Sequence, residues 1–484
     1  MLNKVINRYM NLPLGIKATL WFLVCNLFEK GITIFTTPIF TRLLTVEEYG
    51  KFNIFNSWVS LLTIFISLNL YSGVYSQGLV KNSNREEYAS SLQGLSLTLA
   101  LIWSFIFFLF KDKISSFLNL SIFQIFMLIV IIWSNSSFNF WATKKRVEFD
   151  YKKLIYFTLV VIILKPILGV LFVIKFEDKV NARILSIVIV NIILHSILFF
   201  IQLKEGKKFY IKKYWLSALK FNIPLIPHYL SGTILSVSDR IMIGKIIGND
   251  KAGIYSLAYS LSMIMTIFNS VIFQTLEPWL YKKLKENETK DFAKIMYPSL
   301  IGVALLNLVL IGFAPEIIRI FAPQQYYEAI WIIPPVAMSV YFMFSYTFFA
   351  VFEFYYEKPK YIAFATFLAA SINIVLNYIG INKFGYLAAG YTTLICYIIY
   401  SGMHYIFMTR VCKEFLNNIK VYEVKELLKI SFIFIGISFS FLISYNNIYL
   451  RYFLLCFLIG ILLFNIKKIK SYVYEMIYMR KNKI

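Results

Sequence analysis

Five charged residues interrupt long apolar stretches of the chain: Glu29, Lys30, Lys165, Asp239 and Arg240. A charge at the middle of a bilayer costs at least about 2.5–3.5 kcal/mol, and such residues usually face a protein-lined cavity. Lys and Arg in that position could bind an anion such as a phosphate group. Glu29 and Asp239 could hold the cations when no anion is bound, or take part in ion coupling. The alternative for each is a structural ion pair between packed helices.

Two further cations, Arg42 and Lys245, are predicted at the outer ends of the first and seventh spans, where they could contact the same anion at the rim. Their alternative role is that of exposed loop residues. Lys165 could also snorkel towards the interface beyond a kink at Pro166. Helix kinks are predicted at four prolines: Pro38, Pro166, Pro224 and Pro227.

The remaining ionisable residues predict less. Glu353 is expected to be an ordinary carboxylate at the membrane interface, as is Glu277. His228 is expected to pack as a polar residue at a kink, and His195 and His404 carry no sequence signal. None of them is therefore predicted to belong to the candidate site.

Several kinds of chemistry are disfavoured by the sequence. No G-x-x-x-x-G-K-[ST] motif is present, which argues against ATP hydrolysis. The four cysteines are scattered and form no metal or disulfide pattern, so we expect no metal site. Lys and Arg are spread over short connections between apolar runs, which is typical of membrane topology signals and not of a nucleic-acid surface.

The elements that position these residues are predicted from composition. Hydrophobic residues make up 59% of the 484 residues and charged residues 15%, with a mean hydropathy of +0.68. Apolar runs of about twenty residues are long enough to cross a bilayer as helices, and too long for barrel strands. We predict an all-α integral membrane protein with about fourteen spans, near 16–40, 52–80, 89–110, 114–141, 154–174, 180–202, 217–247, 253–280, 293–320, 329–356, 359–380, 384–409, 427–446 and 448–466.

The orientation of these spans is predicted from the basic residues between them. One set of alternate connections, with both termini, carries 33 Lys and Arg, and the other set carries 12. Because cytoplasmic loops are enriched in Lys and Arg, we expect both termini in the cytoplasm and a multi-pass protein of the cytoplasmic membrane.

An internal repeat divides the chain. Residues 42–57 align with 245–260 at an offset of 203 residues, with Gly50 and Gly253 in register. We expect each glycine to end one helix and start the next. Six spans separate the copies, which predicts a parallel repeat of two six-span lobes around a central cavity. The predicted domains are residues 1–203, residues 204–410, and a region of two extra helices with a basic tail, 411–484.

Three motifs carry a family resemblance. The sequence from Thr36 to Gly50, the Ile223–Pro227 segment with Ser238–Tyr259, and Phe384–Gly390 resemble signatures of polysaccharide repeat-unit flippases (Wzx type). Those proteins belong to the multidrug/oligosaccharidyl-lipid/polysaccharide exporter superfamily. The resemblance covers roughly residues 10–410.

The resemblance implies a transporter and not an enzyme. Its cargo would be an undecaprenyl-pyrophosphate-linked oligosaccharide, moved by alternating access for assembly of O-antigen or capsule. Partners would be membrane lipids, the polysaccharide polymerase and glycosyltransferases, without a resident cofactor; H⁺ or Na⁺ coupling stays open. The alternatives are a lipid-linked peptidoglycan precursor flippase, a multidrug exporter of the same superfamily, or a membrane-embedded polymerase or acyltransferase.

Overall fold

The computed structural model describes residues 14–465, 467 and 471, and no β-strand occurs among them. Ten helical segments of this described part are long and apolar enough to cross a membrane. They are Arg85–Leu109, Ile122–Val147, Tyr151–Lys175, Lys179–Gly206, Asn249–Lys285, Phe292–Gly312, Ile333–Tyr355, Pro359–Phe384, Ala388–Phe415 and Val424–Ser444. The other predicted spans overlap the helices Leu14–Leu43, Val46–Ser67, Ile226–Ile246 and the shorter Ile448–Phe464. The predicted span at 52–80 is interrupted after Ser67, and a second helix begins at Val74. The prediction of an all-α, multi-pass membrane protein is confirmed, whereas the count of fourteen spans stays a prediction.

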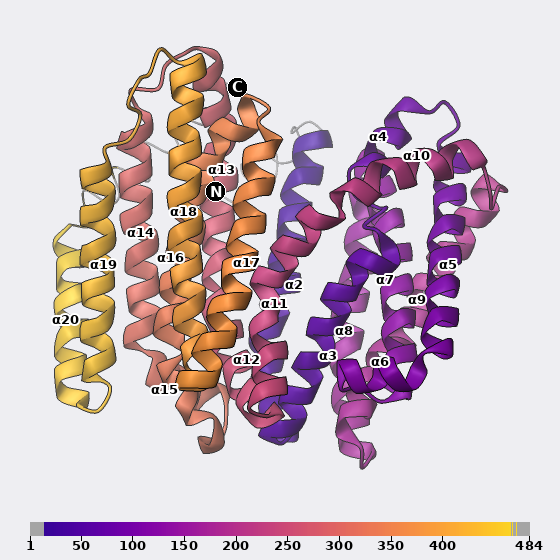
Figure 1. The fold of residues 1–484 in the computed structure, drawn as a ribbon, viewed down its shortest axis with the longest axis horizontal. Coiled ribbons are helices and arrows are strands. Elements are labelled where there is room, and N and C mark those ends of the chain that lie inside the picture. Colours follow the sequence, from indigo (N-terminus) through magenta and orange to yellow (C-terminus); the bar gives the residue numbers. More distant parts are fainter. Residues whose placement is uncertain (1–13, 466, 468–470, 472–484) are drawn as a thin grey trace, which may run out of the picture. The chain divides into compact units, whose positions relative to one another are not determined.

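The chain forms two compact units, residues 1–253 and 254–484 (Figure 1). The helices of unit 1 are α2 (Leu14–Leu43), α3 (Val46–Ser67), α4 (Val74–Lys81), α5 (Arg85–Leu109), α6 (Lys111–Leu118), α7 (Ile122–Val147), α8 (Tyr151–Lys175), α9 (Lys179–Gly206), α10 (Lys212–Asn222), η1 (Ile223–Leu225) and α11 (Ile226–Ile246). Helix α9 packs against α5, α7 and α8, while α3 packs against α7 and α11. The seventh predicted span therefore lies in the same unit as the first six. The lobe boundaries at 203 and 410 stay a prediction.

Unit 2 is built around one buried helix. Its elements are the end of α12 (Asn249–Met263), α13 (Met265–Lys285), α14 (Phe292–Gly312), α15 (Ala314–Phe321), η2 (Gln324–Trp331), α16 (Ile333–Tyr355), α17 (Pro359–Phe384), α18 (Ala388–Phe415), α19 (Val424–Ser444) and α20 (Ile448–Phe464). In the most apolar stretch of α16, 83% of the residues are buried. The helices α13, α14, α17, α18 and α19 all contact α16. Helices α19 and α20 pair at the edge of this unit (Figure 1).

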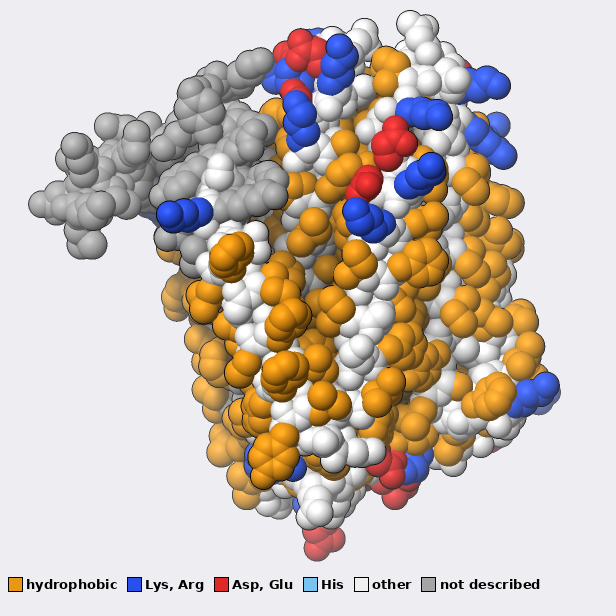
Figure 2. All heavy atoms as spheres, turned by 90° about the vertical axis from the view of Figure 1, so that its left-hand side faces the viewer, with side chains coloured by type: hydrophobic (Ala, Val, Ile, Leu, Met, Phe, Trp, Pro, Cys, Tyr) orange, Lys and Arg blue, Asp and Glu red, His pale blue; other side chains and the backbone are white. Residues whose placement is uncertain are grey.

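The outer face of α19 and α20 has the surface expected in lipid. Phe432, Ile443 and Phe453 are each at least two-thirds exposed, and Phe464 is 90% exposed. Figure 2 shows hydrophobic side chains over the middle of this face, with Lys, Arg, Asp and Glu gathered at its two ends. Lipid tails solvate such a surface, whereas water does not.

Capping explains where α3 begins. The Thr45 side chain accepts from the Glu48 amide, and the Glu48 side chain accepts from the Thr45 amide, which is a capping box. Gly50 consequently lies inside α3, and Gly253 lies inside α12. The expectation that each glycine ends one helix and starts the next is wrong.

The two repeat glycines instead allow a close helix crossing. A Cβ added to Gly50 would lie 1.7 Å from the Asn249 carbonyl oxygen and 2.9 Å from the Gly253 nitrogen. A Cβ added to Gly253 would lie 2.3 Å from the Val46 carbonyl oxygen and 3.1 Å from the Gly50 nitrogen. The start of α12, Asn249–Gly253, thus packs on α3, backbone against backbone.

A buried lysine of unit 1 forms ion pairs with carboxylates from three helical segments. The Lys144 side chain is 5% exposed, and its Nζ lies 2.7 Å from Glu205 and 3.9 Å from Glu86 and Glu148. These carboxylates come from α5, the end of α7 and α9. One α7 cation thereby bridges three segments of the unit.

Candidate functional site

A cavity of about 710 Å³ lies within unit 1, and we call it the unit 1 cavity. Its walls come from α2, α3, α7, α8, α9 and α11, and its polar lining includes Thr33, Ser60, Asn69, Tyr71, Asn135, Asn139, Lys165, Arg183 and His195. No described residue of this lining is an Asp or Glu. The size is typical of a small-molecule or headgroup site, and the charge of its lining favours an anion.

Arg183 is positioned by the start of α9. The Asp178 side chain accepts from the Asn181 amide and starts this helix, so that Arg183 falls in its second turn and lines the cavity. Its guanidinium lies over the ring of Phe40, at 3.4 Å from the centroid, and forms no ion pair with a described residue. A guanidinium stacked on an aromatic ring keeps its charge and its donors for a ligand.

Gly169 makes room for this guanidinium. A Cβ at Gly169 would lie 1.7 Å from Arg183 Nη1 and 3.1 Å from the Phe40 ring. The glycine on α8, the ring on α2 and the cation on α9 therefore form one fitted contact. Arg183 is not selected from the sequence, because it is one of the 12 basic residues assigned to the outer connections.

Lys165 lies on the wall of the unit 1 cavity, beside Pro166. His195 on α9 lines the same cavity and stacks on Phe138, with 5.0 Å between ring centroids. The structure thus brings Lys165 together with Arg183 and His195, two residues that the sequence did not select. The role of Lys165 in binding cargo stays a prediction.

Asp239 and Arg240 lie on α11. Asp239 is 1% exposed, and the Ser238 hydroxyl lies 3.4 Å from its Oδ1. Arg240 does not line the unit 1 cavity. The predicted exchange of partners between Asp239 and Arg240 is not tested by this arrangement.

A second cavity of unit 1, of about 530 Å³, contains Lys245 near the α2–α3 and α11–α12 connections. The Lys245 ammonium donates to the Phe117 carbonyl oxygen at 2.6 Å and lies 4.3 Å from the ring centroid of the same residue. Arg42 is exposed and donates to the Pro38 carbonyl oxygen, one turn earlier in α2, at 2.9 Å. Each predicted rim cation is thus held by backbone, and its role towards the cargo stays a prediction.

The side chains of Glu29 and Lys30 lie outside the described residues, although α2 runs through both positions. The four predicted kinks fall in two settings. Pro38 and Pro166 lie inside the helices α2 and α8. Pro224 lies in the 3-10 turn η1, and Pro227 in the first turn of α11.

Glu353 differs from its expected place. It is fully buried between α16 and α18, with its Oε1 2.7 Å from Nδ1 of the equally buried His404. The expectation of an ordinary interfacial carboxylate is wrong, because α18 extends past the end of α16 and covers this position. No sequence signal joins the two residues, which are 51 positions apart.

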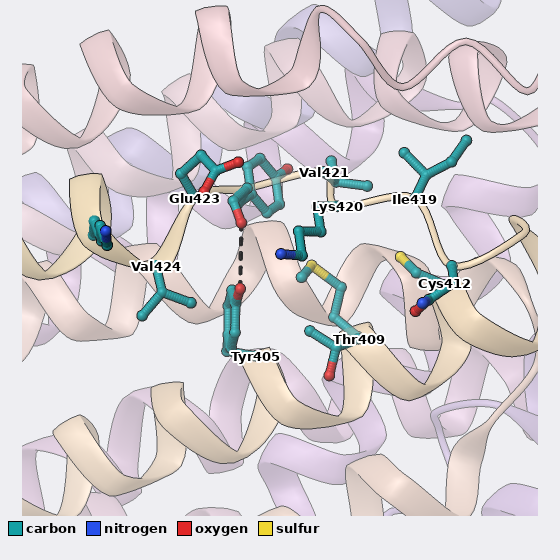
Figure 3. Close-up of a pocket in the computed structure, with 12 residues that line it drawn as sticks. Tyr405, Thr409, Cys412, Ile419, Lys420, Val421, Glu423 and Val424 are labelled. Carbon is teal, nitrogen blue, oxygen red and sulfur yellow. Dashed lines mark hydrogen bonds between the residues drawn. The ribbon is translucent and has the colours of Figure 1, made fainter.

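A third cavity, of about 350 Å³, lies in unit 2 between α18 and the segment that leads into α19 (Figure 3). Lys420 and Glu423 line it, and the Tyr405 hydroxyl donates to the Tyr422 carbonyl oxygen at 3.2 Å. Burial raises the pKa of the Tyr422 phenol well above its usual value. The lining carries two cations, Lys420 and Lys425, and one carboxylate, Glu423, so the cations of this cavity have a counter-charge that the unit 1 cavity lacks among its described residues.

Comparison with known proteins identifies the family. Residues 16–284, more than half of the chain, match the family described as polysaccharide biosynthesis protein. The chain belongs to this family. The resemblance stated from the motifs is therefore confirmed at that level.

Two relatives from Haemophilus influenzae are similar along most of their length. An uncharacterized membrane protein is 25% identical over 375 residues, covering 74% of this chain and 88% of the relative. The Lsg locus putative protein 1 is 25% identical over 392 residues, covering 74% and 89%.

Solved structures show that the fold is shared with transporters. Lipid II flippase MurJ in its inward closed conformation has a TM-score of 0.65 at 15% identity, covering 93% of this chain and all of that one. An inward-facing multidrug resistance MATE family transporter of the MOP superfamily also scores 0.65, at 11% identity, covering 80% and 96%. At these identities the likeness describes the fold alone.

Proposed function

We propose that this chain is a flippase that moves an undecaprenyl-pyrophosphate-linked oligosaccharide across the cytoplasmic membrane for assembly of a surface polysaccharide such as O-antigen or capsule. The observation that carries the proposal is the unit 1 cavity, in which Arg183 and Lys165 face a lining without a described carboxylate. Membership of the polysaccharide biosynthesis family and the transporter fold support it.

The charge of the cavity favours this cargo over a cationic drug. A pyrophosphate presents several anionic oxygens, which the planar donors of Arg183 and the ammonium of Lys165 can bind together. A multidrug exporter that takes up cations would need Asp or Glu in the same place. The lipid tail of the cargo stays in the bilayer, so the cavity has to accept only the headgroup.

The proposed mechanism is alternating access. A ligand shifts a conformational equilibrium only if it interacts differently with the two states. In the proposal, Lys30 and Arg240 are held by Glu29 and Asp239 while no cargo is bound, and the pyrophosphate replaces those partners on arrival. Arg42 and Lys245 then contact it at the outer rim. In the proposal, both termini lie in the cytoplasm. The glycosyltransferases supply the cargo on that side, and the polymerase receives it on the outer side.

The decisive experiment measures where the lipid-linked oligosaccharide lies. A strain without this chain should accumulate the intermediate on the cytoplasmic leaflet and lose the surface polysaccharide. Plasmid-borne wild type should restore both. Arg183→Ala should lower export at least about tenfold, since an interaction of charged donors contributes about 1.5–3 kcal/mol. Arg183→Lys should retain part of the activity because the charge remains.

Matched controls separate the cavity from general loss of charge. Arg319 and Lys383 are exposed cations of unit 2, and their alanine variants should export at the wild-type rate. Lys165→Ala, Lys30→Ala and Arg240→Ala should each reduce export while the protein stays folded in the membrane. Normal export by Arg183→Ala and Lys165→Ala together would refute the role of the unit 1 cavity.

The same strain distinguishes the competing cargoes. If the chain carried a peptidoglycan precursor, its loss would cause accumulation of that precursor and lysis, with surface polysaccharide intact. If it exported drugs, its loss would change drug susceptibility, and neither lipid-linked intermediate would accumulate.

A further inference from the structure

The buried pair Glu353 and His404 has no part in the proposed binding of cargo. It lies in unit 2 between α16 and α18, and both side chains are 0% exposed. Oε1 of Glu353 and Nδ1 of His404 are 2.7 Å apart. The second atom of each group, Oε2 and Nε2, has no hydrogen-bond partner among the described residues.

Aromatic rings enclose the imidazole. Tyr346 stacks on His404 at 5.3 Å between centroids, and Tyr400 meets it edge-on at 4.5 Å. The Tyr400 hydroxyl is occupied by Thr366 of α17, at 3.3 Å. The pair thus has one polar contact, with each other, inside an apolar and aromatic shell.

The ionisable groups that face the pair are the phenols of Tyr346 and Tyr400. Charged residues on the other helices that pack against α16 or α18 find partners elsewhere or are exposed. On α13, Glu277 contacts Tyr281, and Lys283 pairs with Glu286 and Glu288. Lys294 of α14 pairs with Asp291, and Lys429 of α19 pairs with Glu426. Lys360 and Lys383 of α17 are exposed, and Glu328 of η2 accepts a hydrogen bond from Tyr386. Among the described residues, none of these forms an ion pair with Glu353 or His404.

The number of protons on the pair decides its net charge. With one proton, shared between Oε1 and Nδ1, the pair is neutral in sum, either as carboxylic acid and imidazole or as carboxylate and imidazolium. Loss of that proton leaves one uncompensated negative charge in an apolar shell, which is costly to bury. The packed arrangement of α16 and α18 therefore favours the one-proton form. The deprotonated form favours an arrangement that admits water between the two helices.

We propose that Glu353 and His404 form a proton-binding site that couples cargo export to the proton gradient. This inference rests on the proposed function and names H⁺ as the coupling ion. The pair takes one proton from the outer aqueous phase, holds it while α16 and α18 are packed, and releases it to water on the cytoplasmic side when they loosen. Because proton binding and helix packing favour one another, the gradient biases the transport cycle in one direction.

The first test measures proton binding without any cargo. The full-length chain in lipid nanodiscs should show a band of the protonated pair, either a carboxylic acid C=O band or an imidazolium ring band, in infrared difference spectra between neutral and basic pH. Exposed carboxylates stay ionised over this range. Glu353→Gln should abolish the band, His404→Gln should shift its pH midpoint, and Glu426→Gln, which changes an exposed carboxylate of α19, should leave it unchanged. If Glu353→Gln does not fold, Glu353→Asp replaces it, and its band should persist at a shifted frequency. A wild-type spectrum without a titrating band, or a band unchanged in the Glu353 variant, would overturn the proposal.

The second test measures coupling. Proteoliposomes are loaded with the lipid-linked oligosaccharide extracted from the deletion strain, and the outer side is made more acidic by one pH unit. One proton per cargo should shift the steady-state distribution between leaflets by about tenfold. Glu353→Gln should equilibrate the cargo without that shift, whereas His404→Gln should show the shift over a displaced pH range.

The two tests separate the possible failures. If the wild type does not move the cargo at all, the proposed function fails while the infrared test still decides whether the site binds a proton. If the wild type moves the cargo and Glu353→Gln responds to the gradient equally, the proposed function stands and the inference is refuted.

Discussion

Gly50→Ala tests the crossing of α3 and α12 directly. The new Cβ would lie 1.7 Å from the Asn249 carbonyl oxygen, whereas ordinary contacts begin at 3.4 Å. The atom that it meets is backbone in the first turn of α12, so no side-chain rotation can relieve the overlap. The start of α12 must move away from α3 by about 1.7 Å to reach an ordinary contact. Overpacking of this kind costs about 1–3 kcal/mol, and occasionally more.

This cost opposes the preference of helices for alanine. Replacing a glycine inside a helix stabilises it by about 0.5–1 kcal/mol. We expect a net loss of up to about 2 kcal/mol for Gly50→Ala, and a smaller loss for Gly253→Ala, whose Cβ would lie 2.3 Å from the Val46 carbonyl oxygen. Gly232→Ala is the matched control, because nothing lies within 4 Å of its Cβ, and it should be neutral or stabilising.

The assay is thermal inactivation of the purified chain in one detergent at one scan rate, since unfolding of such proteins is often irreversible. The double variant Gly50→Ala/Gly253→Ala should lose less than the sum of the two single losses, because both act on one crossing. Equal stability of Gly50→Ala and Gly232→Ala would refute the close backbone contact. Export of surface polysaccharide, measured in parallel, should fall in the Gly50 variant.

Three other predictions follow from the described contacts. Gly169→Ala should lower export about as much as Arg183→Ala while the chain stays folded, because its Cβ would lie 1.7 Å from the guanidinium; normal export would show that the guanidinium can shift without loss. Lys144→Ala should lower stability in thermal scans by about 1–3 kcal/mol, as a buried cation with three carboxylates is lost, whereas Lys153→Ala removes an exposed pair and should change it by less than about 1 kcal/mol. A cysteine at Asn249, in a chain without its native cysteines, should be labelled from outside the cell; external labelling of the α13–α14 connection would contradict the predicted topology.

The long apolar helices could be predicted from the sequence, because a helix that crosses lipid needs a long apolar run. An apolar run of sufficient length is a span, and the predicted span at 154–174 coincides with α8, Tyr151–Lys175. Lys165 could be selected for the same reason, as a cation in such a run is unusual. Its position on the cavity wall agrees with the expectation that mid-membrane charges face the interior.

Other features depend on helix ends and on packing, which hydropathy does not report. Arg183 lies near the start of the predicted span at 180–202, where a basic residue normally marks the membrane interface, and hydropathy does not show that its side chain lines the cavity. The capping sequence from Thr45 to Glu48 could have shown that Gly50 is inside a helix. The contact between Glu353 and His404 depends on the rotation of two helices about their axes, and a single sequence does not determine it.

The lining of the unit 1 cavity has a consequence for the ionic conditions of transport. A cavity with Arg183 and Lys165 and no described carboxylate attracts small anions from solution whenever it is open to water. Cargo then binds by displacing those counter-ions, and mass action makes its apparent affinity fall as the salt concentration rises. Two displaced monovalent anions would give a slope of about −2 in a plot of log affinity against log salt. The chloride and phosphate of the cell interior would thus set the cargo concentration at which export is half-maximal.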